Sequence, residues 1–153
     1  MQLTFTPEKE IKRVFELQKK HYREEANKSI AHRKKKLIRL EKSIFKHREA
    51  IKEALYKDHK KTSFECDMLD MLPVLREIRN AKKNIYKWCA DKNVSTPLML
   101  LGSRSYVRYE SKGVVLIMAP WNFPVNLTFV PMISAIAAGN TVMYHTSEQV
   151  PHV

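Results

Sequence analysis

The chain has 153 residues, enough for one domain of ordinary size with a sizeable buried core. Hydrophobic residues make up 44% of it, which excludes wholesale disorder, and only three glycines argue against a glycine-rich phosphate-binding loop. The net charge of +12 raises nucleic acid or an anionic membrane surface as partners. That charge is uneven, because residues 1–93 carry 25 of the 28 lysines and arginines. The chain therefore changes near residue 93 from a strongly charged part to a part with few charged residues.

The cysteines and the apolar runs bear on location. Cys66 and Cys89 show no spacing typical of metal ligands, so we interpret them as half-buried thiols in a reducing compartment, with a disulfide as the alternative. The first seven residues show no signal-peptide pattern. No stretch reaches the roughly 18 uninterrupted apolar residues of a membrane span. The sequence predicts a cytoplasmic protein with no membrane span.

Residues 1–93 have the spacing of amphipathic helices with a charged outer face. Apolar residues recur every three or four positions over residues 7–27, which predicts a first helix. Ser29 can cap a second, longer helix over residues 29–54, whose narrow apolar seam suits packing against another helix. A third helix over residues 62–88 opens with Thr-Ser-Phe-Glu, the spacing of a capping box, and Pro73 must kink or divide it.

Residues 94–153 have the pattern of strands around one helix. Residues 94–97 form an extended joint before a proline, and residues 105–110 alternate like a half-exposed strand. Residues 114–119 are a continuous apolar run, as in a strand buried on both faces. A helix over residues 126–138 and a second buried strand over residues 141–144 complete a βαβ unit, whose strands should be parallel. Two parallel strands alone leave their faces uncovered and their edges unpaired, so the unit either packs against the helical region or belongs to a larger α/β domain.

A stiff loop directly after the first buried strand is the place to look for chemistry. Its sequence over residues 119–124 is Ala-Pro-Trp-Asn-Phe-Pro, and ligands of open α/β sheets bind at the carboxyl ends of strands. Asn122 could donate a hydrogen bond there to a developing oxyanion. The alternative is a turn asparagine that bonds to the local backbone, which is the more frequent case for an arbitrary loop of this kind.

The amino-acid sequences of three segments closely resemble those of the aldehyde dehydrogenase family. Residues 113–124 are Gly-Val-Val-Leu-Ile-Met-Ala-Pro-Trp-Asn-Phe-Pro, residues 131–142 are Pro-Met-Ile-Ser-Ala-Ile-Ala-Ala-Gly-Asn-Thr-Val, and residues 147–151 are Ser-Glu-Gln-Val-Pro. The resemblance spans residues 29–153 and is closest to shorter members acting on fatty and aromatic aldehydes. It implies an α/β fold: an N-terminal helical region, 1–93, followed by the first strands of a Rossmann-like NAD(P)-binding domain, 94–153, which is incomplete.

The resemblance also implies roles for individual residues. Asn122 matches the asparagine whose amide, with a backbone N–H, forms the family's oxyanion hole. Pro120 and Trp121 match residues that line the nicotinamide cleft of NAD or NADP, and Glu148 matches an acidic residue that hydrogen-bonds the adenosine ribose. His145 is a departure, because it stands where the family has a lysine that contacts the ribose, and imidazole is shorter and mostly neutral at pH 7.

The family activity, NAD(P)-dependent oxidation of an aldehyde to a carboxylate, also needs a cysteine nucleophile and a glutamate base. In the family both lie beyond the position of Val153, and Cys66 and Cys89 do not have the sequence context of the nucleophile. We therefore expect an N-terminal fragment that is inactive alone and, because its sheet is unfinished, self-associates.

Two alternatives come from other classes of protein. One is a basic helical module that binds nucleic acid or anionic surfaces through residues 32–36 and 57–61, but interleaved acidic residues favour a solvated helix face and predict no specific nucleic-acid binding. The other is a fragment that complements a separate C-terminal part.

Overall fold

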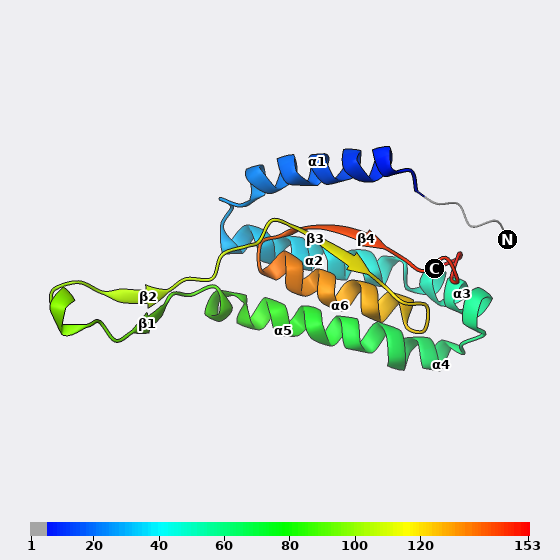
Figure 1. Cartoon of the computed structure of the whole chain (residues 1–153). Coiled ribbons are helices and arrows are strands. Elements are labelled where there is room, and N and C mark those ends of the chain that lie inside the picture. Colours follow the sequence, from blue (N-terminus) through cyan, green and yellow to red (C-terminus); the bar gives the residue numbers. More distant parts are fainter. Residues whose placement is uncertain (1–5) are drawn as a thin grey trace.

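Residues 6–153 are described by the structure, a computed structural model (Figure 1). Residues 1–5, on which the signal-peptide prediction partly rests, lie outside the described residues. The helices are α1 (Glu8–Glu25), α2 (Ile30–Lys46), α3 (Arg48–His59), α4 (Ser63–Glu65), the π-helical η1 (Cys66–Met71), α5 (Leu72–Trp88), the 3-10 turn η2 (Leu98–Leu100) and α6 (Pro124–Ala137). The strands are β1 (Lys92–Val94), β2 (Ser105–Val107), β3 (Val114–Met118) and β4 (Thr141–His145).

The two helix caps expected from the sequence are formed, and two helices are divided. Ser29 Oγ accepts a hydrogen bond from the backbone N–H of His32, and Thr62 with Glu65 makes the reciprocal bonds of a capping box. The expected second helix is interrupted at His47, whose backbone leaves the helical region, so it becomes α2 and α3. The expected third helix is divided, as Pro73 predicted, into α4, η1 and α5. Pro73 lies in the first turn of α5, and the π-helical η1 directly precedes it.

The predicted βαβ unit is confirmed by the pairing of its strands. β3 and β4 are parallel neighbours in a register that sets Val114 beside Thr141 and Met118 beside His145, and α6 connects them. The expected strand over residues 105–110 is shorter, because β2 ends at Val107 and pairs antiparallel with β1. The sequence predicted only an extended joint near β1. Together β1 and β2 form a ribbon that projects from the rest of the molecule (Figure 1).

Helices lie on both sides of β3 and β4, with α6, α2 and α5 on one side and α1 across the other (Figure 1). Tyr22 on α1 donates a hydrogen bond to the Ser111 carbonyl over 3.0 Å, and Thr141 on β4 donates one to the Gln18 carbonyl over 3.2 Å. The expectation that residues 114–119 are buried on both faces is wrong for part of the strand. Met118 is 73% exposed, because a groove separates this face of β3 from α1.

One apolar core joins the helical region to the βαβ unit. Its buried side chains come from α2, α3, η1, α5 and α6: Leu37, Ile44, Leu55, Cys66, Met71, Val74, Ile78, Ala81, Ile85, Val125, Ile133 and Ala137. The βαβ unit therefore packs against the helical region through α6, which is one of the two arrangements left open by the sequence. The division into domains at residue 93 stays a prediction. Across residues 6–153, the structure contains no helix both long and apolar enough to cross a bilayer.

Candidate functional site

The loop over residues 119–123 begins where both parallel strands end. Met118 and His145 are neighbours in the register of β3 and β4, and the N–H of Ala119 donates to the His145 carbonyl over 2.9 Å. The loop then turns into α6 at Pro124, a residue suited to the first helical position. This is the edge of an open α/β sheet at which ligands bind.

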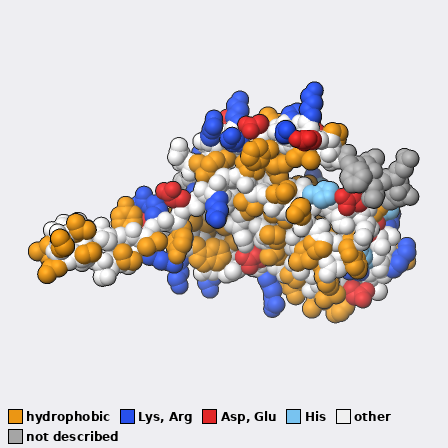
Figure 2. Space-filling view, viewed as in Figure 1, with side chains coloured by type: hydrophobic (Ala, Val, Ile, Leu, Met, Phe, Trp, Pro, Cys, Tyr) orange, Lys and Arg blue, Asp and Glu red, His pale blue; other side chains and the backbone are white. Residues whose placement is uncertain are grey.

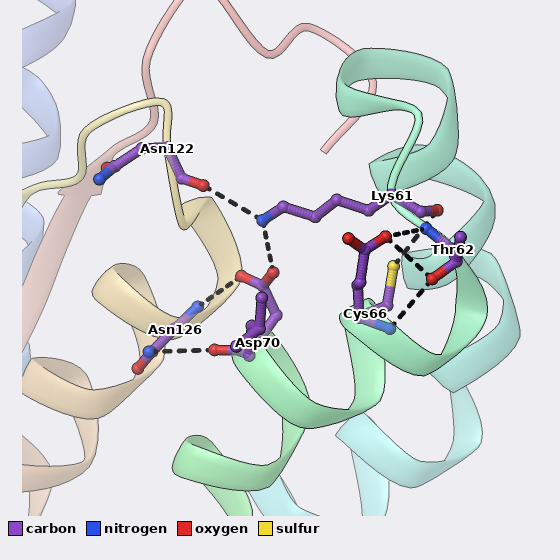
Figure 3. A network of polar contacts seen from close by, with 8 residues as sticks. Lys61, Thr62, Cys66, Asp70, Asn122 and Asn126 are labelled. Atoms are coloured by element: carbon purple, nitrogen blue, oxygen red, sulfur yellow. Dashed lines mark hydrogen bonds and ion pairs between the residues drawn. The ribbon is translucent and has the colours of Figure 1, made fainter.

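Asn122 lies exposed in this loop with its backbone held and its side chain turned outward. Its carbonyl accepts a hydrogen bond from Lys61 Nζ over 3.1 Å, and its side-chain amide points away from Lys61 (Figure 3). Among residues 6–153 the structure gives this amide no hydrogen-bond partner, so the alternative of a side chain bonded to the local backbone is not what the structure has. The amide is therefore available to a ligand.

A buried ion pair that the sequence did not reveal lies beneath the loop. Lys61 Nζ is 2.7 Å from Asp70 Oδ2 and 4.5 Å from the centroid of the Phe123 ring. Asp70 is fully buried although it is ionisable. Lys61 looked like one more cation of the basic run over residues 57–61, and nothing in a single sequence tells which lysine of such a run faces inward.

Trp121 and Pro120 form the exposed apolar part of the loop. The Trp121 ring stacks on His59 at the end of α3, with centroids 6.4 Å apart and an interplanar angle of 28°. The buried Nε2 atom of His59 has no hydrogen-bond partner among the residues that the structure describes. His59 is thus a second residue of the helical region that supports the loop, and it too was missed by the sequence analysis.

His145 and Glu148 form a separate pair just after β4. His145 Nε2 lies 2.9 Å from Glu148 Oε1, and both side chains are half exposed. A hydrogen bond from its own backbone, and then the bond to His145, lower the pKa of Glu148 below its usual value. Like an ordinary glutamate, Glu148 is an ionised acceptor near neutral pH. The pair borders a groove of about 410 Å³ that runs between α1 and the exposed face of β3 and β4.

Neither cysteine lies in the loop, and both are free thiols. Cys66 is buried in η1, where burial and then the charge of Asp70 raise the pKa of its thiol. A raised pKa keeps the thiol protonated and unreactive. Cys89 is half-buried at the end of α5, with Sγ 3.9 Å from the Ala137 carbonyl. Residues 6–153 contain no cluster of His, Cys, Asp and Glu suited to a metal ion.

Many of the basic residues in the helical region are paired with carboxylates. Lys36 lies against Glu25, Lys57 lies 2.7 Å from Glu53, and Arg48 and Lys52 share Asp67. Within the two basic runs, Lys36 and Lys57 are paired at the surface, but Lys61 is only 14% exposed and the Nε atom of Arg33 is buried. The interpretation of these runs as solvated helix faces is therefore wrong for Lys61 and Arg33. A nucleic-acid partner gains no support from these ion pairs.

Comparison with known proteins gives one consistent result. Residues 2–153 match the family model described as the aldehyde dehydrogenase family. The 4,4'-diaponeurosporen-aldehyde dehydrogenase of Staphylococcus aureus is 40% identical over 143 residues, which are 94% of this chain and 31% of that protein.

Two solved structures agree with it. The substrate-bound state of Staphylococcus aureus AldH superposes with a TM-score of 0.89 at 39% identity, covering 93% of this chain and 31% of that one. The NAD-dependent benzaldehyde dehydrogenase of Corynebacterium glutamicum gives a TM-score of 0.80 at 26% identity, covering 92% and 30%. The chain spans about a third of the length of these relatives. By sequence and by fold, the chain belongs to the aldehyde dehydrogenase family.

Proposed function

We propose that this chain contributes the oxyanion-binding loop and one edge of the cofactor site to an NAD(P)-dependent aldehyde dehydrogenase. Attack of a nucleophile on an aldehyde carbonyl places negative charge on the oxygen, and a preoriented N–H donor stabilises that charge. Asn122 has the required properties, because its amide is exposed and unpaired within the described chain while its carbonyl is held by Lys61. This arrangement is the observation on which the proposal rests.

The residues of the edge suit a dinucleotide. NAD or NADP, when bound, accepts the hydride of the oxidation. Glu148 would accept a hydrogen bond from a ribose hydroxyl, since a glutamate carboxylate is ionised near neutral pH. Trp121 and Pro120 would offer an apolar wall near the strand ends. His145 already bonds to Glu148, so in this chain it would orient the carboxylate, whereas the family's lysine contacts the ribose directly.

The activity of the loop can be tested in a chimeric enzyme. The chain would replace the matching 143 residues of the Staphylococcus aureus relative, which would supply the remainder of the protein. In that chimera Asn122→Ala should lower kcat by about 10²- to 10³-fold, the usual effect of removing one oxyanion donor. Asn93→Ala, an exposed amide on β1, is the matched control and should leave kcat unchanged. Equal kcat values for the two variants would overturn the proposal.

We also propose that the chain associates with itself. The turn between β1 and β2 exposes several apolar side chains in succession, of which Met99 is 97% exposed, and Figure 2 shows them at the projecting end of the molecule. Exposed apolar patches and open strand edges favour association. Serine at Leu98 and Leu101 should lower the sedimentation coefficient toward that of a monomer. An unchanged coefficient would exclude this surface. The two free thiols support the proposal of a cytoplasmic location.

A further inference from the structure

An ion pair is buried directly beneath the candidate loop. The side chain of Lys61 is 14% exposed and that of Asp70 is fully buried, with 2.7 Å between Nζ and Oδ2. Such a pair is weak evidence for stability, because removing both charges from water offsets most of their attraction. The role of the Lys61–Asp70 pair is therefore better inferred from the groups that it contacts than from its electrostatic attraction.

Lys61 directs its ammonium group at the loop. An ammonium has three N–H donors. One bonds to Asp70, a second reaches the Asn122 carbonyl over 3.1 Å, and the group lies 4.5 Å from the centre of the Phe123 ring (Figure 3). These contacts fix the peptide that joins Asn122 to Phe123, with the Asn122 side chain on the far side from Lys61. Rotation of that peptide would break the bond to the carbonyl.

Asp70 holds the other end of the same loop. Its Oδ1 lies 3.5 Å from the backbone nitrogen of Asn126 in the first turn of α6, whose N-cap residue, Phe123, offers no side-chain bond. A carboxylate at this place also favours the positive end of the helix dipole. The Asn126 amide in turn donates to the Leu69 carbonyl over 3.3 Å. The N-terminal region thus supplies a missing helix cap.

Lys61 itself is held by the chain on both sides. Lys60 ends α3 with a φ of 58°, and Thr62 begins the capping box of α4 (Figure 3). The carbonyl of Lys61 also lies 3.9 Å from the Cys66 sulfur. Because the backbone on both sides of Lys61 is already fixed, ordering its side chain requires no further ordering of the main chain.

We propose that Lys61, with Asp70 as its buried counter-ion, is a positioning residue that orders the loop and aims the Asn122 amide. This inference rests on the proposed function, because it explains how the oxyanion donor is held before a substrate arrives. It also gives the helical region a role in that site. Small misplacements of a reacting group can lower rates by about 10²-fold, so such ordering matters for turnover.

The test uses the 153-residue chain and measures the order of the loop by ¹⁵N relaxation. In the parent chain the backbone order parameters of Trp121, Asn122 and Phe123 should be about 0.85, the value typical of a rigid backbone. Lys61→Met should lower them below about 0.6. Lys60→Met is the matched control, because that neighbouring ammonium lies over Tyr56 and does not touch the loop. Lys61→Arg should restore the order, since a guanidinium can donate to the same two acceptors.

A second variant keeps the test decisive if Lys61→Met fails to fold. Replacing both charges, as in Lys61→Met with Asp70→Leu, leaves no unpaired buried charge and should preserve the fold. The loop should still lose its order while the helices keep theirs. Loop order equal to that of Lys60→Met in a folded variant would overturn the inference.

The measurement separates this inference from the proposed function. Loop order does not depend on turnover, so an ordered loop in the variants that carry Lys61→Met overturns the positioning role alone. An unchanged kcat for Asn122→Ala in the chimera overturns the proposed function and leaves the relaxation result standing.

Discussion

Replacing Ile133 with alanine tests whether the helical region and the βαβ unit unfold together. Ile133 on α6 is fully buried in the core shared with α2 and α5. The change removes three carbon atoms, worth about 0.8 kcal/mol each, or roughly 2.4 kcal/mol before any cavity term. Measured values for such changes run from about 2 to 5 kcal/mol. With a urea slope of about 2 kcal/mol per molar, the midpoint should fall by about 1 M or more.

Two single-tryptophan proteins make this test local. Trp88 reports on α5 in the helical region and Trp121 on the loop after β3, so each is kept while the other is changed to phenylalanine. Urea unfolding followed by fluorescence should show the same loss of stability for Ile133→Ala at both probes. Leu116→Ala on the exposed face of β3 is the control and should shift neither by much. A shift at Trp121 with an unmoved transition at Trp88 would refute the shared core.

The remaining predictions concern pH, thiols and turnover. Burial alone would raise the pKa of Asp58, but hydrogen bonds from His152 and Val153 hold it below its usual value. The lowered pKa of Asp58 adds stability that is fully present above the unfolded pKa of about 4 and is lost as the pH falls through the folded pKa. Asp58→Asn should therefore flatten the fall in urea stability on the acid side of a pH profile. An unchanged pH profile would contradict this. Thiol labelling at about pH 8 should modify Cys89 before Cys66, and equal rates would contradict the burial of Cys66. The chain alone should yield no reduced nicotinamide from aldehydes with NAD or NADP, because neither thiol lies in the loop; turnover would contradict this.

Much of the fold could be predicted because it depends on local sequence patterns, such as apolar runs and capping residues. The apolar run over residues 114–119 is bounded by Gly113 and Pro120, and Gly139 follows shortly after the end of the next helix, so a βαβ unit was the simplest interpretation. Capping residues such as Ser29 also act within four positions of each other. Patterns of this kind carry their information in neighbouring residues.

The parts that the sequence did not reveal depend on residues far apart. Lys61 and Asp70 meet the loop across about sixty positions, and one lysine in a basic run carries no sign that it points inward. The exposure of Met118 depends on which layers cover β3, and the apolar run cannot show that. The role of Asn122 was suggested by its place after a buried strand and then by the resemblance, and it stays a prediction.

A crystal structure of the chimeric enzyme with a bound aldehyde would show directly whether Asn122 binds the substrate oxygen. We expect the Asn122 amide nitrogen within about 3 Å of the substrate oxygen, with the Asn122 carbonyl still bonded to Lys61. A substrate oxygen that bonds to other groups, with the Asn122 amide turned away from it, would rule out Asn122 as the oxyanion donor.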